Sequence, residues 1–211
     1  MSNKYFKLMK DALILFVITL ISGLSLGFVN ELTKVPIAAR EMETKLKAYQ
    51  IVYNSADHIK ADEELILKVE EQGLDKIDKA YTGIYINEVN QAYDNNNNMI
   101  GYIVITTTNN GYGGPITLAL GYTVDGVMMG VEILSMNETA DLGSKVNDPE
   151  FKNQFIDREQ QEFRLIKGEV NADDEIAAVS GATMSSDAVV DAINGSLAFI
   201  NEYGAISGGD K

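Results

Sequence analysis

The chain has 211 residues, a formal net charge of −14 at pH 7 and a hydrophobic content of 45%, which is sufficient for a packed core. The negative charge disfavours binding to nucleic-acid phosphates, and the lack of cysteine excludes disulfides, thiolate-held iron–sulfur clusters and cysteine nucleophiles. The chain has one histidine, His58, so a histidine-rich metal site is excluded. The polar stretch around His58 is typical of an ordinary surface position.

An uncharged, apolar segment covers residues 12–30. At about 1.5 Å per residue, a helix over this segment would be roughly 28 Å long, close to the thickness of a hydrocarbon core. Lys4, Lys7 and Lys10 precede it, and no comparable positive cluster follows. Because the more basic flank stays in the cytoplasm, we expect a cytoplasmic N-terminus over 1–11 and a transmembrane helix over 12–30.

A cleaved signal peptide is the alternative interpretation of this segment. Its apolar run exceeds a typical signal-peptide core, and no clear small-residue cleavage site follows it. We therefore expect an uncleaved single-pass anchor in the cell membrane, with the main domain extracellular or periplasmic.

The region 31–80 is predicted to be a helical connection. Pro36 is expected to mark the exit from the anchor, because proline disrupts a helix interior. Residues 37–53 and 61–72 have charged faces with apolar residues at three- and four-residue spacing, which predicts two helices that pack against a sheet.

The pattern changes at about Tyr81. Four stretches rich in β-branched and aromatic residues follow one another, with turn signals between them: 81–93, 99–108, 115–124 and 127–136. The asparagine-rich segment 94–98 and the pair Asp125-Gly126 are typical of hairpin turns. We therefore predict an antiparallel meander.

Helical spacing returns at 149–156 and 185–203, so the fold class is α+β. We expect one domain over 81–205 and a C-terminal tail over 206–211. No strand is followed by a G-x-G-x-x-G or Walker A sequence, which excludes the common nucleotide folds.

Two of the predicted connections could bind a ligand. Residues 111–115 hold three glycines, which would let the backbone approach something flat or bulky, although such loops also serve simply as turns. Residues 137–143 form a small polar loop after the fourth strand, a usual place for binding groups, and also an ordinary connection between a strand and a helix.

The stretch Ser180-Gly-Ala-Thr183 lies directly before the last predicted helix. Ser185 or Ser186 would cap this helix, and Asp187 would support its positive end. A helix N-terminus with free N–H groups is also a ready phosphate site, and small neighbours leave Thr183 accessible. Capping and phosphate binding explain these residues equally well.

Together, these three stretches resemble a known family. Residues 180–186, Ser-Gly-Ala-Thr-x-Ser-Ser, resemble the flavinylation motif of the FMN-binding domain in the G subunit of Rnf complexes, and in the C subunit of the sodium-translocating NADH:quinone reductase. Residues 111–116 and 137–143 resemble the family's glycine-rich connection and its Glu-Thr-Pro-Gly-Leu-Gly loop. The N-terminal anchor and the order of the motifs also match the family, and the chain length favours the Rnf subunit.

The resemblance implies that Thr183 carries FMN through a phosphoester bond, installed by a flavin transferase that uses FAD, and so makes the chain a phosphoprotein. It also implies that the domain over 81–205 is an FMN-binding domain. The implied cofactor-binding residues are Ser180, Gly181, Ala182, Thr183, Ser185, Ser186, Gly113, Gly114, Glu138, Thr139, Leu142 and Gly143. No catalytic or metal-binding residue is implied.

Two positions differ from the family pattern. Ala140-Asp141 stand where Pro-Gly is usual, and Ala177 stands where an aspartate commonly precedes the motif serine by three residues. That aspartate belongs to the recognition pattern of the transferase.

The resemblance further implies an electron carrier that is not catalytic on its own. It would act with other membrane subunits of an Rnf-type complex that couples ferredoxin:NAD oxidoreduction to sodium or proton translocation. The alternatives are a membrane-anchored flavoprotein that donates electrons to another extracytoplasmic acceptor, and a flavin-free adaptor in which residues 180–183 only begin a helix.

Overall fold

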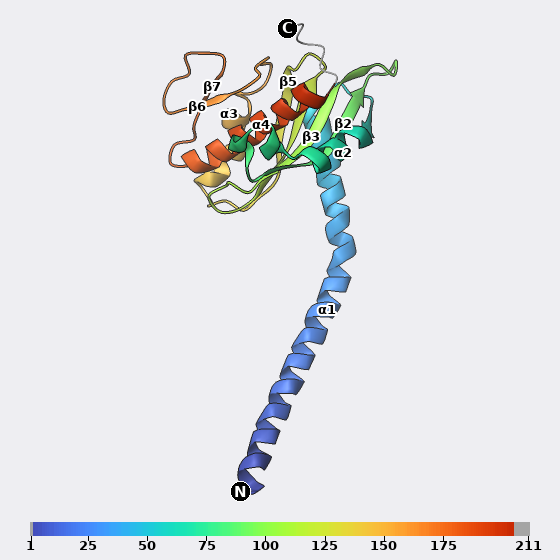
Figure 1. Ribbon diagram of the computed structural model, residues 1–211, viewed down its shortest axis with the longest axis vertical. Coiled ribbons are helices and arrows are strands. Elements are labelled where there is room, and N and C mark those ends of the chain that lie inside the picture. Colours follow the sequence, from blue (N-terminus) through green and yellow to red (C-terminus); the bar gives the residue numbers. More distant parts are fainter. Residues whose placement is uncertain (1, 205–211) are drawn as a thin grey trace. The chain divides into compact units, whose positions relative to one another are not determined.

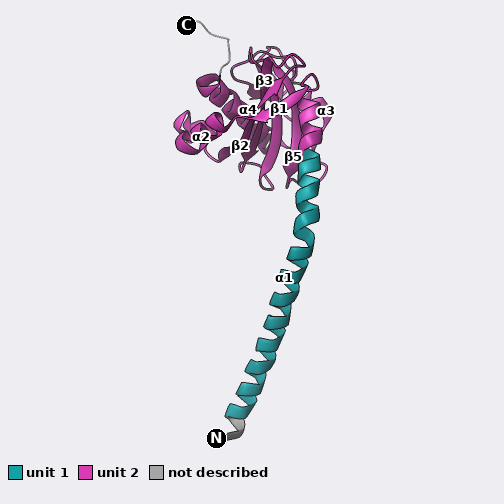
Figure 2. Ribbon diagram, turned by 90° about the vertical axis from the view of Figure 1, so that its right-hand side faces the viewer, with its two compact units in different colours: residues 1–44 teal, residues 45–211 magenta. Residues whose placement is uncertain are grey.

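The computed structural model describes residues 2–204, with side chains from residue 5 onward, in two compact units (Figure 2). Met1–Thr44 form the first unit and Lys45–Lys211 the second. The tail predicted over 206–211 lies outside the described residues.

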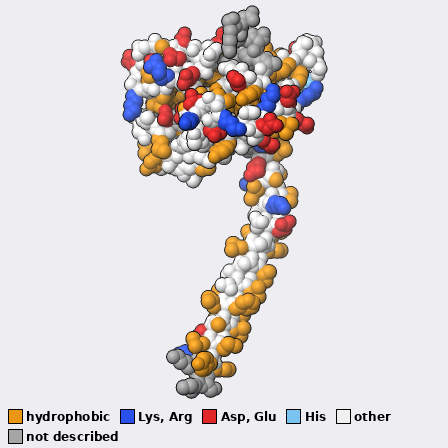
Figure 3. Space-filling view, viewed as in Figure 1, with side chains coloured by type: hydrophobic (Ala, Val, Ile, Leu, Met, Phe, Trp, Pro, Cys, Tyr) orange, Lys and Arg blue, Asp and Glu red, His pale blue; other side chains and the backbone are white. Residues whose placement is uncertain are grey.

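The first unit is part of helix α1 (Ser2–Val52). This helix is long and apolar enough to cross a membrane, by length and composition, and its large hydrophobic side chains from Tyr5 to Leu46 are exposed (Figure 3). It fits a single-pass membrane protein. Pro36 lies inside α1, so the helix does not end at this residue, and the exit from the anchor at Pro36 stays a prediction. A proline in a helix interior costs about 3 kcal/mol, because it removes one backbone hydrogen bond and its ring clashes with the preceding turn.

The second unit is built on a five-stranded antiparallel sheet in which neighbours in sequence are neighbours in space (Figure 1). The predicted meander and the α+β class are confirmed. The turn at 94–98 has Asn97 at φ 60°, and Gly126 has φ 83°. The strands are β1 (His58–Ala61), β2 (Ile84–Tyr93), β3 (Met99–Thr108), β4 (Ile116–Thr123) and β5 (Met128–Met136).

Strand β1 is an addition to the predicted elements, because the sequence indicated only helices over 31–80. Its four residues are too few to show an alternating pattern, and it pairs along the edge of β2. His58 is half-buried and stacks on Tyr93 of that strand, with ring centroids 5.1 Å apart.

Helical segments and a short parallel pair of strands make up the rest of the second unit. The helix predicted over 61–72 is α2 (Glu63–Gln72), and the helix predicted over 149–156 is only one turn long. The last helix begins two residues earlier than expected. The elements are α2, the 3-10 turns η1 (Leu74–Lys76), η2 (Lys79–Tyr81) and η3 (Gly143–Asn147), helix α3 (Pro149–Lys152), strands β6 (Arg164–Ile166) and β7 (Glu175–Ala177), and helix α4 (Thr183–Tyr203).

Both faces of the sheet are covered. Helices α2 and α4 pack on one face, where Val104 and Leu118 belong to the larger hydrophobic core together with Val189 and Ile193 of α4. The last turns of α1, from Lys45 onward, pack on the other face. The central strands β3 and β4 are therefore buried almost throughout.

Paired glycines allow the end of α1 to approach the sheet closely. Gly121 of β4 and Gly130 of β5 are register partners, and both face the backbone of Val52. A Cβ at Gly130 would lie 2.7 Å from Val52 Cα, and one at Gly121 would overlap Val52 O. Any larger residue at these positions would therefore push α1 off the sheet.

We predict that Gly121→Ala lowers the free energy of unfolding of the second unit by about 1 to 3 kcal/mol, because the added methyl group overpacks this contact. Urea unfolding of the purified chain in detergent measures the effect. Gly27→Ala is the matched control, since no atom lies within 4 Å of the position of its Cβ. Equal stability of the Gly121→Ala variant and the wild type would contradict the predicted contact.

Candidate functional site

Three segments that are far apart in the sequence meet at one end of the sheet (Figure 1). The glycine-rich loop (109–115) joins β3 to β4, the second loop (137–142) follows β5, and the pre-helix loop (178–182) leads into α4. All twelve of the predicted cofactor-binding residues lie on these segments or on the first residues of η3 and α4.

Two hydrogen bonds join the glycine-rich loop to the second loop. The side chain of Asn137 donates from Nδ2 to the carbonyl oxygen of Gly113 at 3.0 Å. The backbone N–H of Gly113 donates to Glu138 Oε2 at 3.2 Å. A Cβ at Gly113 would overlap the backbone oxygen of Asn137, so the loops lie in direct contact.

The carboxylate of Glu138 fills the space that the glycines leave. A Cβ at Gly111 would lie 2.8 Å from Glu138 Oε1, and one at Gly143 would overlap Oε2 of the same carboxylate. The predicted reason for these glycines was close approach to a ligand, whereas here they make room for the chain's own side chain. Oε1 itself is buried and has no hydrogen-bond partner among the described residues.

The second loop keeps a left-handed turn without glycine. Asp141 has φ 62°, and its N–H donates to Ser144 Oγ at 3.1 Å. Aspartate is one of the few residues other than glycine that visit this conformation routinely. The Ala140-Asp141 pair is therefore compatible with a left-handed backbone at the position of the family's usual glycine.

The pre-helix loop is closed by Ser186, which lies inside α4. Ser186 Oγ donates to Ala182 O at 2.9 Å and accepts from the N–H of Val179 at 3.0 Å. The prediction that Ser185 or Ser186 is the N-cap is wrong, because both are buried in the helix and Ala182 is the N-cap. The reason is geometric: the left-handed Gly181, at φ 79°, turns the chain into the helix before either serine.

Thr183 is the first residue of α4 and is exposed. No side chain caps this helix terminus, and its first turn contains no acidic residue. The N–H groups of such a terminus attract an anion, and the helix dipole adds to that attraction. A phosphate near Thr183 would therefore be stabilised by the backbone.

Contacts also link the pre-helix loop to the second loop, and α4 to η3. A Cβ at Gly181 would lie 3.2 Å from Leu142 Cδ2, and one at Gly143 would lie 2.9 Å from Ser185 Oγ. Three large apolar side chains remain exposed on these same segments: Tyr112 at 67%, Leu142 at 49% and Met184 at 54%. This end of the domain thus offers apolar surface beside an uncapped helix terminus.

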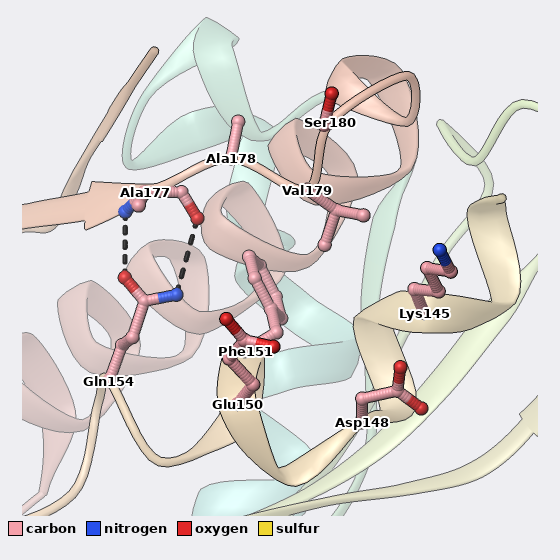
Figure 4. A pocket seen from close by; sticks show the side chains of 9 residues that line it. All are labelled: Lys145, Asp148, Glu150, Phe151, Gln154, Ala177, Ala178, Val179 and Ser180. Atoms are coloured by element: carbon pink, nitrogen blue, oxygen red, sulfur yellow. Dashed lines mark hydrogen bonds between the residues drawn. The ribbon is translucent and has the colours of Figure 1, made fainter. Parts of the chain in front are cut away.

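A cavity of about 350 Å³ lies beside the pre-helix loop (Figure 4). One wall is the chain from Ala177 to Ser180, and Phe151 and Gln154 belong to the opposite wall. Gln154 was not among the predicted site residues. It is 23 residues from Ala177 in sequence and belongs to no motif, so no sequence signal could have identified it.

A carboxyl group on α4 has a perturbed pKa. Burial, together with the negative charges of Asp187 and Glu162, raises the pKa of Asp191 from 3.8 to about 6. A raised pKa means that ionisation of Asp191 opposes folding, with stability lost as the pH rises from 3.8 through about 6. Within residues 2–204, no cluster of three or more His, Cys, Asp or Glu side chains could hold a metal ion.

We predict that Gly113→Ala destabilises the domain by about 1 to 3 kcal/mol, because the two loops must separate to accommodate a methyl group. Chemical denaturation followed by tyrosine fluorescence measures the loss. Tyr112→Ala, one residue away, removes an exposed side chain and should change stability by less than about 0.5 kcal/mol. The loop contact would be disproved if the two variants were equally stable.

Known proteins resemble this chain in sequence and in fold. The FMN-binding domain family matches residues 111–198, which contain all three segments from Gly111 onward. The fold is similar to that of the C subunit of the Na(+)-translocating NADH-quinone reductase from Parabacteroides distasonis, with a TM-score of 0.55 and 16% identity. That similarity covers 82% of this chain and 96% of the other.

Two relatives are named as G subunits of ion-translocating complexes. The G subunit of the Na(+)-translocating ferredoxin:NAD(+) oxidoreductase complex of Acetobacterium woodii is 31% identical over 194 residues, which cover 89% of each chain. The G subunit of the ion-translocating oxidoreductase complex of Methanosarcina acetivorans is 33% identical over 112 residues, 53% of this chain and 57% of the relative. The chain therefore belongs to the family of G subunits of Rnf-type ion-translocating oxidoreductase complexes.

Proposed function

We propose that this chain is an electron-transfer subunit with FMN bound covalently to Thr183. It would relay electrons between other membrane subunits of an Rnf-type complex that couples ferredoxin:NAD oxidoreduction to sodium or proton translocation. The observation that carries the proposal is an exposed threonine hydroxyl on the first residue of α4, whose N-terminus no side chain caps.

The residues around Thr183 fit each part of FMN. The first N–H groups of α4 suit its phosphate. The exposed faces of Tyr112, Leu142 and Met184 suit an aromatic ring system, because apolar and aromatic side chains line most cofactor sites. The unpartnered oxygen of Glu138 would accept a hydrogen bond from a hydroxyl or N–H of the ligand.

The chain itself would supply attachment and placement. Bound FMN would supply one- and two-electron redox chemistry, which no side chain of this protein provides. Thr183 would anchor the cofactor, and the contacts of Glu138 and Asn137 would hold the two loops that line it. A covalent bond would retain the cofactor outside the cytoplasm, where free FMN is scarce.

Attachment would be a phosphoryl transfer from FAD, carried out by a flavin transferase. The Oγ of Thr183 would form a bond to the phosphorus next to the riboflavin, and the bond from that phosphorus to the bridging pyrophosphate oxygen would break. AMP would leave, and the hydroxyl proton would pass to a base or to water. The product would be a phosphoester on Thr183.

We predict that Thr183→Val abolishes covalent flavin, because the variant keeps the shape of the side chain and lacks the attacking oxygen. An exposed first-turn position tolerates the change, so stability should alter by about 1 kcal/mol or less. Wild type produced with a flavin transferase should give a fluorescent band on a denaturing gel, and mass spectrometry should locate the added mass on the peptide containing Thr183.

The control is Thr82→Val, which changes an exposed threonine outside the three site segments and removes one hydrogen bond, to Lys79 O. It should retain the fluorescent band. A band in the Thr183→Val variant, or none in wild type, would refute attachment at Thr183. A colourless wild type would favour the adaptor alternative.

We also propose that the N-terminus is cytoplasmic and that the domain lies on the other side of the membrane. The support is the lysine-rich flank of the apolar helix. Because the chain lacks cysteine, one introduced cysteine reports its own location. Asn95, in the exposed β2–β3 turn, is a suitable position.

In intact cells, or in spheroplasts where an outer membrane is present, Asn95→Cys should react with a membrane-impermeant maleimide. Asn3→Cys should react only after lysis. The reverse pattern would show that the domain faces the cytoplasm.

A further inference from the structure

The side chain of Gln154 binds both backbone groups of Ala177. Its Oε1 accepts a hydrogen bond from the N–H of Ala177 at 2.7 Å, and its Nε2 donates to the carbonyl oxygen of Ala177 at 3.2 Å (Figure 4). The neighbouring amide of Ala178 donates instead to Ile166 on β6. Gln154 therefore occupies the edge of β7 that β6 does not use.

This pair of bonds holds the beginning of the pre-helix loop. Ala177 ends β7 and lies three residues before Ser180. The far end of the loop is held by Ser186, which bonds Val179 and Ala182. Only the few residues between these two attachments bring the chain from β7 to Thr183, so Gln154 and Ser186 together restrict where Thr183 is presented.

We propose that Gln154 is a positioning residue for the modification of Thr183. The inference rests on the proposed function, in which Thr183 Oγ bonds to the phosphorus of FAD and AMP leaves. Gln154 touches none of the reacting atoms in the described structure, since its contacts are to the Ala177 backbone. It acts by keeping the pre-helix loop in one conformation before the transferase binds.

The expected effect on the KM of the transferase follows from the fraction of the protein that has the competent conformation of the pre-helix loop. When only a fraction of the acceptor molecules has the competent loop conformation, the apparent affinity falls by that fraction. Loss of the Gln154 bonds should therefore raise the KM of the transferase for this protein and leave kcat unchanged. Replacement of a residue that takes part in the chemical step would instead lower kcat.

The side chain suits this task because it offers one donor and one acceptor in a single plane. Gln154→Leu keeps a similar volume and removes both bonds. Gln154→Glu keeps an acceptor for the N–H of Ala177, but its carboxylate would face the carbonyl oxygen of Ala177 and repel it. Protonation of that glutamate would restore a donor, so lowering the pH toward about 4 to 5 should restore the pair of bonds.

The first measurement is hydrogen exchange of the flavin-free protein, which requires no modification. The amide of Ala177 should exchange faster in Gln154→Leu than in wild type, and the thermal midpoint should change little because Gln154 is only half-buried. Gln161→Leu is the matched control, since Gln161 is exposed and lies in the same connection between α3 and β6. Unchanged exchange at Ala177 would overturn the proposal.

The second measurement is the rate of flavin attachment by a purified transferase with FAD, at varied concentrations of the flavin-free protein. Gln154→Leu should show a higher KM, by up to roughly tenfold, the limit set by the free energy of one net hydrogen bond, with the same kcat. Gln161→Leu should match wild type. The rate of Gln154→Glu relative to wild type should rise as the pH falls.

The outcomes separate the two proposals. A Gln154→Leu protein with the wild-type KM, or a Gln154→Glu protein whose relative rate does not respond to pH, would overturn the role of Gln154 alone. A wild-type protein that receives no flavin would overturn the attachment proposal and this one with it.

Discussion

The packing of α4 against the sheet is the contact on which the site depends. Most residues of this helix from Ser185 to Ile200 are buried, and its core partners lie on β2, β3 and β4. Burial of this apolar surface of α4 against the sheet fixes the orientation of the helix and its position along its own axis. Its N-terminus, with Thr183 exposed, consequently lies where the 109–115 and 137–142 loops leave the sheet.

The glycines of the site could make room for a ligand or for another part of the protein, and the sequence does not distinguish these two roles. A glycine leaves space, and either a ligand or the protein can occupy that space. In this structure the space over Gly111, Gly113 and Gly143 holds the backbone oxygens of Gly114 and Asn137 and the Glu138 carboxylate. The two loops are thus joined through Asn137 and Glu138, and Glu138 Oε1 is buried without a hydrogen-bond partner among the described residues.

At both positions that differ from the family motif, Asp141 and Ala177, the backbone makes hydrogen bonds with a nearby side chain. Asp141 adopts the left-handed conformation for which glycine is the usual choice, and its N–H donates to the Ser144 hydroxyl, which supports that turn. Ala177 has no carboxylate, and its backbone N–H and carbonyl group form hydrogen bonds with the side chain of Gln154. Ser144 and Gln154, which make these hydrogen bonds, both lie outside the motif segments, so a comparison of the motif alone would not show them.

The sequence by itself determined the apolar helix, the four-stranded meander, the last helix and the three segments that carry the motif, because all of these follow from local periodicity, turn residues and residue order. It did not determine β1, β6 and β7, which are too short to show a pattern and form only by pairing. Nor did it determine that α1 continues through Pro36. The Gln154–Ala177 bonds and the burial of Glu138 Oε1 against the glycine-rich loop were decided by the tertiary structure alone, since each joins residues that only the packing of distant segments brings together.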